Sequence, residues 1–288
     1  MIWQTTRFAI DLGRPRVMGI VNVTPDSFSD GGRDADAARA HCDTLVAQGA
    51  DILDIGGEST RPGSPRPTPD EELARVLPVL RHAVTLGVPI SVDTSQPKVI
   101  EAALALGVDI INDVRALRVP GAAERVAAHA GCGVCLMHMQ GEPENMQLAP
   151  AYGDVVAEVA QFLAGCADGL RQRGVAASRI VLDPGYGFGK TVAHNLQLIR
   201  QQEALLPLGY PLLVGLSRKS TLGTVTGRPV GDRLIPSVAA ALAAAERGAA
   251  RGVALRTVGR LRRGWEWICR RCRSSTRPYG ASCSRSLP

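Results

Sequence analysis

Short apolar runs rich in Val, Ile and Leu alternate with longer amphipathic segments along most of the chain. Each run ends in Gly or a polar residue, and its length suits a strand buried on both faces. This alternation is typical of repeated βαβ units with a parallel sheet. Seven strands are predicted in this way, at Val17–Val23, Asp51–Gly56, Pro89–Thr94, Asp109–Val114, Gly133–His138, Arg179–Asp183 and Pro211–Leu216. The helices expected between and after them include Ala35–Gln48, Pro69–Leu86, Gln96–Leu106, Tyr152–Arg173, Val192–Leu205 and Pro236–Arg247.

Polar residues cluster at the C-terminal end of each predicted strand, at Asn22, Glu58–Thr60, Asp93, Asn112, His138, Asp183 and Ser217–Lys219. In a (β/α)8 barrel these carboxyl ends meet on one rim, where the active site lies. An open doubly wound sheet would show the same alternation, but it would place ligand groups mainly at one switch point. The pattern therefore favours an α/β fold of the TIM type, a (β/α)8 barrel. Its eighth β/α unit is expected to be aberrant or missing, because Val253–Val258 matches a strand poorly.

The charge is unevenly distributed along the 288 residues. Residues 251–288 contain ten Arg and one acidic residue, Glu266, for a net charge of +9, whereas residues 1–250 have 23 basic and 26 acidic residues, for −3. We therefore divide the chain into a barrel, residues 1–250, and an atypical Arg-rich tail, residues 251–288, which we expect to be partly disordered. An arm that binds nucleic-acid phosphates is the less favoured alternative for this tail.

Seven Cys scattered along the chain do not suggest a disulfide framework, and they fit a reducing, cytoplasmic location. No apolar run is long enough to cross a membrane. The pairs Cys132/Cys135 and Cys269/Cys272 have the spacing of a four-thiolate zinc site. However, the first pair lies in a predicted strand, where positions three apart face opposite sides, so buried structural thiols are favoured over zinc.

Two carboxylates and one amide stand at the ends of three predicted strands. Asp93 and Asp183 each follow apolar residues, so their carboxylates should be partly desolvated and need hydrogen-bond donors. A heterocycle with an amidine-like or guanidine-like edge offers two parallel N–H groups, which a carboxylate accepts bidentately. Asn112 could supply a donor and an acceptor beside them. The alternative, that each Asp only caps the next helix, explains one such residue better than it explains three.

The loops Asn22–Gly32 and Gly56–Gly63 are too rich in Gly, Pro and polar residues to continue as strand or helix. The second could bind phosphate oxygens through Arg61, and both could close over the rim to exclude water. Beyond the seventh predicted strand, Lys219 can hydrogen-bond a ring carbonyl or nitrogen. Ser220, at the start of a helix, can help hold a carboxylate.

The glycine-rich run Gly185–Thr191 does not have the spacing of a nucleotide-binding loop. A P-loop would need Gly in place of Pro184, and the third Gly is misplaced for a dinucleotide fingerprint. We predict a tight turn in which the glycines let Asp183 and Phe188 face the rim. His138 is either a further rim group or a buried, hydrogen-bonded histidine.

Four of these segments together resemble the dihydropteroate synthase family, namely Met18–Gly32, Asp54–Gly63, Asp183–Lys190 and Ser217–Ser220. The resemblance implies a transferase of folate biosynthesis and a sulfonamide target. In the implied reaction, the amine of p-aminobenzoate displaces pyrophosphate from 6-hydroxymethyl-7,8-dihydropterin diphosphate to give 7,8-dihydropteroate. It also implies Mg2+ as a cofactor and a homodimer formed through late helices.

The resemblance further implies roles for individual residues. The pterin ring would be held by Asp93, Asn112, Asp183 and Lys219, and the magnesium-bound diphosphate partly by Asn22. The p-aminobenzoate pocket would be formed by Thr60, Arg61, Pro62, Phe28, Phe188 and Ser220. Diphosphate would leave first, with Asp30 stabilising the pterin cation, so the implied catalytic residues are Asp30, Lys219 and Asp93. A cationic centre needs preorganised carboxylate charge, and the departing diphosphate needs a metal.

The chain departs from the family pattern after residue 250. The family closes its barrel with a strand bearing an Arg-x-His pair that helps hold the diphosphate, but no His follows His194 here. We hypothesise that this end is translated from a shifted reading frame. An Arg-x-His sequence in another frame of the gene would support this, and its absence from all frames would refute it. A catalytically impaired pterin-binding barrel and a pterin-dependent methyltransferase are the alternative functions; the long first loop and Ser217–Ser220 argue against the latter.

Overall fold

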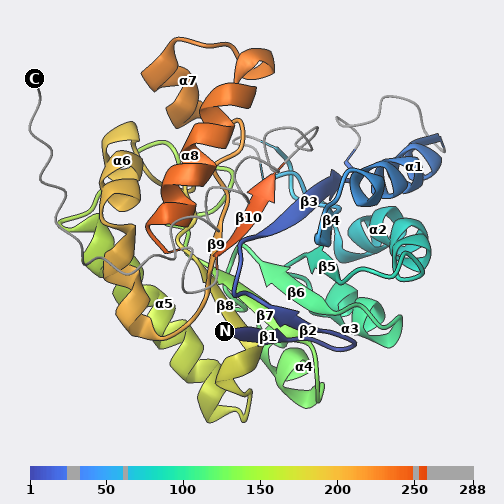
Figure 1. Cartoon of the computed structure of the whole chain (residues 1–288). Helices are drawn as coiled ribbons and strands as arrows, with labels where there is room; N and C mark the ends of the chain where they lie inside the picture. The colour runs from blue at the N-terminus through green and yellow to red at the C-terminus, as the bar shows by residue number, and fades with distance from the viewer. Residues whose placement is uncertain (25–32, 61–63, 249–252, 258–288) are drawn as a thin grey trace, which may run out of the picture.

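The structure, a computed structural model, describes residues 1–24, 33–60, 64–248 and 253–257. Eight parallel strands form a closed barrel in the order β10-β3-β4-β5-β6-β7-β8-β9 (Figure 1). Their bounds are β3 Arg16–Asn22, β4 Ile52–Gly56, β5 Ile90–Asp93, β6 Ile110–Asp113, β7 Gly133–Met137, β8 Ile180–Asp183, β9 Leu212–Val214 and β10 Val253–Thr257. The predicted TIM-type barrel is confirmed, and the seven predicted strands correspond to β3 through β9.

Helices surround the barrel, as the sequence pattern predicts (Figure 1). They are α1 Arg33–Ala47, α2 Pro69–Ala83, α3 Pro97–Ala105, α4 Ala122–Ala128, α5 Val155–Gln172, α6 Val192–Arg200, α7 Ser220–Thr226 and α8 Leu234–Glu246, with 3-10 segments η1 Ala177–Arg179, η2 Gln202–Leu208 and η3 Val230–Asp232. Local sequence fixes where α2 begins. The Thr68 hydroxyl accepts the Glu71 amide at 3.3 Å and the Glu71 carboxylate accepts the Thr68 amide at 2.8 Å, a reciprocal cap that stabilises a helix start.

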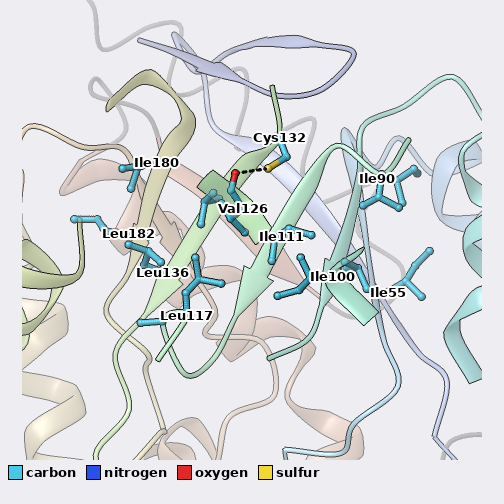
Figure 2. Packing of buried hydrophobic residues seen from close by; sticks show 14 of the residues in the cluster. Ile55, Ile90, Ile100, Ile111, Leu117, Val126, Cys132, Leu136, Ile180 and Leu182 are labelled. Carbon is cyan, nitrogen blue, oxygen red and sulfur yellow. Dashed lines mark hydrogen bonds between the residues drawn. The ribbon is translucent and has the colours of Figure 1, made fainter. Parts of the chain in front are cut away.

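The apolar core has two layers because each strand faces both the barrel interior and the helices. Outward side chains such as Ile55, Ile111 and Leu182 pack with Ile100 of α3 and Val126 of α4 (Figure 2). Inside the barrel, apolar residues from alternate positions of the strands form a second cluster that includes Met18, Ile52, Ile110, Cys135, Val181 and Leu213. The interior is therefore packed, and a ligand can bind only at an end of the barrel.

A short antiparallel hairpin of β1 (Ile2–Gln4) and β2 (Ala9–Asp11), which the strand pattern did not predict, covers the amino-terminal end of the barrel. The Trp3 ring is completely buried, and its Nε1 donates a hydrogen bond to the Arg179 carbonyl at 2.9 Å, just before β8. Trp3 belongs to the interior cluster together with Ile10 and Leu12. Since this end is closed, the carboxyl ends of the strands are left as the place for a site.

Strand β10 closes the barrel by pairing with β3 on one side and with β9 on the other. Leu255 pairs with Val17 of β3 on one side and with Val214 of β9 on the other. An eighth strand is therefore present, at the position where the sequence offered only a poor candidate, and it lies within the segment that we assigned to the tail. The remaining predicted tail, residues 258–288, lies outside the described residues.

Within the described part of the chain, no helix is long and apolar enough to span a membrane.

The thiols of Cys132 and Cys135 lie on opposite sides of the sheet, as the strand period predicts. Cys132 belongs to the outer layer, where its Sγ lies 3.8 Å from the Val126 carbonyl (Figure 2), and Cys135 belongs to the barrel interior. One metal ion could not be bound by both. The second pair, Cys269 and Cys272, lies outside the described residues.

Candidate active site

The register of the barrel brings three predicted site residues to the same level of the rim. Asn22 is opposite Gly56, Gly56 is opposite Asp93, and Asp93 is opposite Asn112 on consecutive strands β3 to β6. A Cβ at Gly56 would lie 3.3 Å from the Asp93 Cβ and 3.9 Å from the Asn22 side-chain oxygen. Gly56 therefore keeps the space between the Asn22 and Asp93 side chains open.

Asn112 is buried, and a hydrogen bond to Asp54 fixes its orientation. Its Nδ2 donates a hydrogen bond to Asp54 Oδ2 at 3.1 Å, and both side chains are buried. Asp54 begins the motif Asp54–Gly63, which by itself predicts no role for this carboxyl group. The signal for it was nonetheless in the sequence, because a carboxylate in the middle of the apolar run Ile52–Gly56 must have a polar partner.

Asp183 ends β8 at the opposite side of the rim and is nearly inaccessible to solvent. Its Oδ1 accepts the Gly185 amide at 2.7 Å. Gly185 has φ +66°, and a Cβ there would lie 1.9 Å from the His138 carbonyl oxygen, so only glycine fits. The predicted tight turn after β8 is confirmed, and glycine is required where the turn passes against the end of β7.

The buried ammonium group of Lys190 stabilises this turn. Its Nζ donates to the carbonyls of Gly185 and Phe188, each at 3.0 Å, and lies 2.8 Å from His138 Nδ1. Burial lowers the pKa of Lys190 to about 7 and the pKa of His138 to about 3, the latter helped by the charge of Lys190. Of the two interpretations of His138, the buried and hydrogen-bonded one is therefore correct, and the imidazole is neutral at physiological pH.

Lys219 and Phe188, from different strand ends, lie against each other. The Lys219 Nζ lies 4.1 Å from the centre of the Phe188 ring, a distance at which a cation is attracted to the ring face. A Cβ at Gly187 would lie 3.1 Å from Lys219 Cδ, so a glycine here gives this side chain room. Ser220 is exposed at the first position of α7, the start of a helix, as predicted.

The comparisons with known proteins agree with this geometry. Residues 18–253 match a family described as pterin binding enzyme. The dihydropteroate synthase of Neisseria meningitidis serogroup C is 55% identical over 254 residues, which cover 86% of this chain and 90% of that protein. This chain belongs to the dihydropteroate synthase family.

Solved structures of two dihydropteroate synthases have the same fold along almost the whole chain. The Xanthomonas albilineans enzyme with 4-aminobenzoic acid is 46% identical with a TM-score of 0.85, and the match covers 94% of this chain and 96% of that one. The Burkholderia cenocepacia enzyme complexed with 7,8-dihydropteroate is 45% identical with a TM-score of 0.84, covering 96% and 98%. A dihydropteroate synthase is a transferase, so the chain is assigned to that class of enzyme.

The structure places some, but not all, of the residues predicted for a dihydropteroate synthase. Asn22, Asp93, Asn112 and Asp183 lie at the carboxyl ends of their strands, and Phe188, Lys219 and Ser220 follow strands at the same end of the barrel. Thr60 is half-buried in the loop after β4, where the hydroxyls of Ser59 and Ser64 lie 2.9 Å apart across the loop. The remaining predicted residues, Phe28, Asp30, Arg61 and Pro62, lie outside the described residues.

Proposed function

We propose that the chain condenses p-aminobenzoate with 6-hydroxymethyl-7,8-dihydropterin diphosphate, giving 7,8-dihydropteroate and pyrophosphate. The observation that carries this proposal is that Asp93, Asn112 and Asp183 place polar side chains at the carboxyl ends of their strands. They surround one rim of the barrel, and the amino-terminal end of the barrel is closed. The Burkholderia cenocepacia relative, whose structure contains 7,8-dihydropteroate, has the same fold over nearly its full length.

In this proposal the pterin ring lies between Asp93, Asn112, Asp183 and Lys219. The buried Asp183 carboxylate accepts two parallel N–H groups of the pterin edge, an interaction that is strong where water is excluded. The Asn112–Asp54 hydrogen bond prevents the amide from rotating, so its donor and acceptor stay aimed at one ligand. Lys219 donates to a ring carbonyl or nitrogen while its charge lies over Phe188.

The same proposal assigns p-aminobenzoate to the side of the rim formed by Thr60, Arg61, Pro62, Phe28, Phe188 and Ser220. Phe188 supports this assignment because its ring packs in a small apolar cluster and lies against Lys219, while its backbone carbonyl accepts a hydrogen bond from Lys190. Bond breaking to the diphosphate precedes attack by the amine, and Asp30 stabilises the pterin cation, with Lys219 and Asp93 as the other catalytic residues. Fixed carboxylate charge around a cationic centre requires no solvent reorganisation at the moment of reaction.

Mg2+ fits the oxygen donors at this rim. The Asn22 amide is exposed at the end of β3, and Gly56 leaves space beside it. In the part of the chain that the structure describes, no group of three or more His, Cys, Asp or Glu could form a complete protein site. Magnesium commonly binds through one or two protein oxygens together with phosphate oxygens and water, and the Asn22 amide oxygen could supply one of them. When bound, the ion would neutralise charge that develops on the leaving diphosphate.

The missing Arg-x-His pair favours one alternative, a pterin-binding barrel with impaired catalysis. Steady-state release of pyrophosphate from the two substrates and magnesium decides between them, with Asp183→Ala as the comparison. Release that requires p-aminobenzoate and is abolished in Asp183→Ala supports the synthase. Release no higher than in the variant refutes it, and retained binding of the pterin diphosphate by the parent chain would then support the impaired barrel.

We also propose a cytoplasmic homodimer. The support for a dimer is the exposed apolar side chains near the neighbouring helices α7 and α8 (Figure 1), at Val225, Val230, Leu234 and Ile235. Contiguous exposed apolar residues commonly mark a protein interface. Light scattering after size exclusion should give twice the chain mass for the parent and a single chain mass for Ile235→Asp. A monomeric parent would refute the dimer.

A further inference from the structure

Arg115, in the loop after β6, is a buried cation that is not among the residues proposed to bind substrate or magnesium. Its side chain is 4% exposed and contacts three other loops at the carboxyl end of the barrel. Nη1 and Nη2 donate to the two carboxylate oxygens of Glu58 at 3.1 and 2.8 Å, in the loop after β4. Nη1 also donates to Ser95 Oγ at 3.1 Å after β5, and Nε donates to Glu142 at 2.7 Å after β7. Four consecutive loops are thus joined through one guanidinium.

Arg115 and two of its three partners, Glu58 and Ser95, are close in sequence to residues of the proposed site. Glu58 is two residues before Thr60, on the proposed p-aminobenzoate side. Ser95 is two residues after Asp93, and Arg115 itself is three residues after Asn112, both on the proposed pterin side. The bidentate pair with Glu58 has a fixed, planar geometry that a lysine cannot reproduce. The position of the β4 loop is therefore tied to the strand ends that would hold the pterin.

The backbone that presents Arg115 is strained and held by a second buried acid. Ala116 and Leu117 have φ +53° and +57°, values that side chains other than glycine rarely adopt. Asp113 accepts the Arg115 and Leu117 amides, each at 2.8 Å, and also the Ser95 hydroxyl. Backbone strain that is locked by surrounding hydrogen bonds is typical of functional sites. The bonds from the Arg115 and Leu117 amides have backbone donors, so they remain when the Arg115 side chain is changed.

We propose that Arg115 is a positioning residue that sets the affinity for p-aminobenzoate by holding Glu58, and with it Thr60, against the pterin-binding strand ends. Its guanidinium is committed to Glu58, Ser95 and Glu142, so it acts on substrate only through the loop that it holds. This inference rests on the proposed function for its substrate, but the holding of the loop can be measured separately.

The first test compares Arg115→Met with Arg125→Met. Arg125 on α4 is a matched control because it forms an exposed ion pair with Glu101. For Arg115→Met we expect the KM for p-aminobenzoate to rise about tenfold to a hundredfold, because small displacements of positioning groups have effects of this size. The KM for the pterin diphosphate should change less than about threefold, as for a contact that does not serve that substrate. Equal changes in both KM values, or none, would overturn the proposal.

The double variant Glu58→Gln/Arg115→Met separates positioning from stability. Removing Arg115 alone leaves the Glu58 charge buried without its partner, whereas the double variant removes both charges. Under the proposal, the double variant regains the parent's melting temperature but keeps the raised KM for p-aminobenzoate. If both return to the parent's values, the role of Arg115 is structural only and the proposal fails. Arg115→Lys, which keeps the charge, provides a folded comparison should Arg115→Met not fold, and it should show an intermediate KM.

A readout that needs no turnover keeps the two proposals distinguishable. Deuterium exchange at the amides of residues 57–60 should be faster in Arg115→Met than in Arg125→Met. If the parent chain releases no pyrophosphate, the proposed function fails, and this exchange experiment still decides whether Arg115 holds the loop. Equal exchange in the two variants would refute the holding of the loop.

Discussion

Glu72, in the first turn of α2, is a fully buried carboxyl group packed beneath the loop after β4. A Cβ at Gly57 would lie 3.0 Å from Glu72 Cγ. Neither Glu72 oxygen makes a hydrogen bond of good geometry to the described residues. Burial raises the pKa of Glu72 from 4.5 to about 7, the charges of Glu58 and Asp93 act in the same direction, and Thr94 and Arg66 oppose them. Glu72 should therefore change its protonation near neutral pH.

The size and sign of the effect on stability follow from this pKa. Because the folded-state pKa is higher than the unfolded one, the folded chain binds more protons between pH 4.5 and about pH 7, and stability falls as the pH rises through that window. The difference between the two pKa values corresponds to about 3 kcal/mol of destabilisation. This destabilisation is absent at pH values below the pKa of Glu72 in the unfolded chain, and it is complete at pH values above the pKa of Glu72 in the folded chain.

Glu72→Gln removes the titration while keeping the shape of the side chain. Urea unfolding gives the free energy of unfolding of each protein. The value for Glu72→Gln minus the value for the parent should increase by about 2–3 kcal/mol between pH 5 and pH 8. The amide introduces its own burial cost, but that cost does not depend on pH, so only the slope of the difference is diagnostic. Glu144→Gln, at an exposed glutamate, is the control for the substitution itself. A difference for Glu72→Gln that is constant across this range would refute the reasoning.

Two further predictions concern the turn after β8 and the closure of the barrel. Gly185→Ala should lower the free energy of unfolding by about 2 kcal/mol or more, because φ is +66° and the new Cβ would overlap the His138 carbonyl. Gly165→Ala in the middle of α5, where a Cβ meets nothing within 4 Å, should instead raise it by about 0.5–1 kcal/mol; equal effects in urea unfolding would contradict the geometry. A chain ending at Gly248 should lose cooperative unfolding because β3 and β9 both lose their partner β10, whereas a chain ending at Thr257 should unfold cooperatively. Circular dichroism melts compare the two, and cooperative unfolding of the shorter chain would show that β10 is not needed.

The order of the elements could be predicted because each depends on a local pattern. The run Ile180–Asp183 is apolar on both faces and ends in a carboxylate, which already describes a barrel strand with a rim residue. Thr68 and Glu71 have the spacing of a helix cap, and the structure contains both of its hydrogen bonds. The hairpin of β1 and β2 could not be predicted in the same way, because three-residue strands are too short to show a period.

The site was predicted as a set of residues but not as a network. Asp93, Asn112 and Asp183 could be selected because they end apolar strands. Arg115 could not, because its importance lies in a pairing with Glu58, 57 residues earlier in the chain. Likewise, Lys190 reads as an ordinary polar residue until the fold buries its ammonium against the Gly185 and Phe188 carbonyls.

The sequence by itself determined the βα alternation, the polar residues at the strand ends and the family, since all of these depend on residue type and spacing along the chain. Only the tertiary structure decided which loops are joined, that His138 is neutral and buried, and that Val253–Thr257 completes the barrel. The physical reason is that burial and long-range pairing set the energies of charged groups and of strand edges. Both arise only when the barrel closes and brings distant segments together.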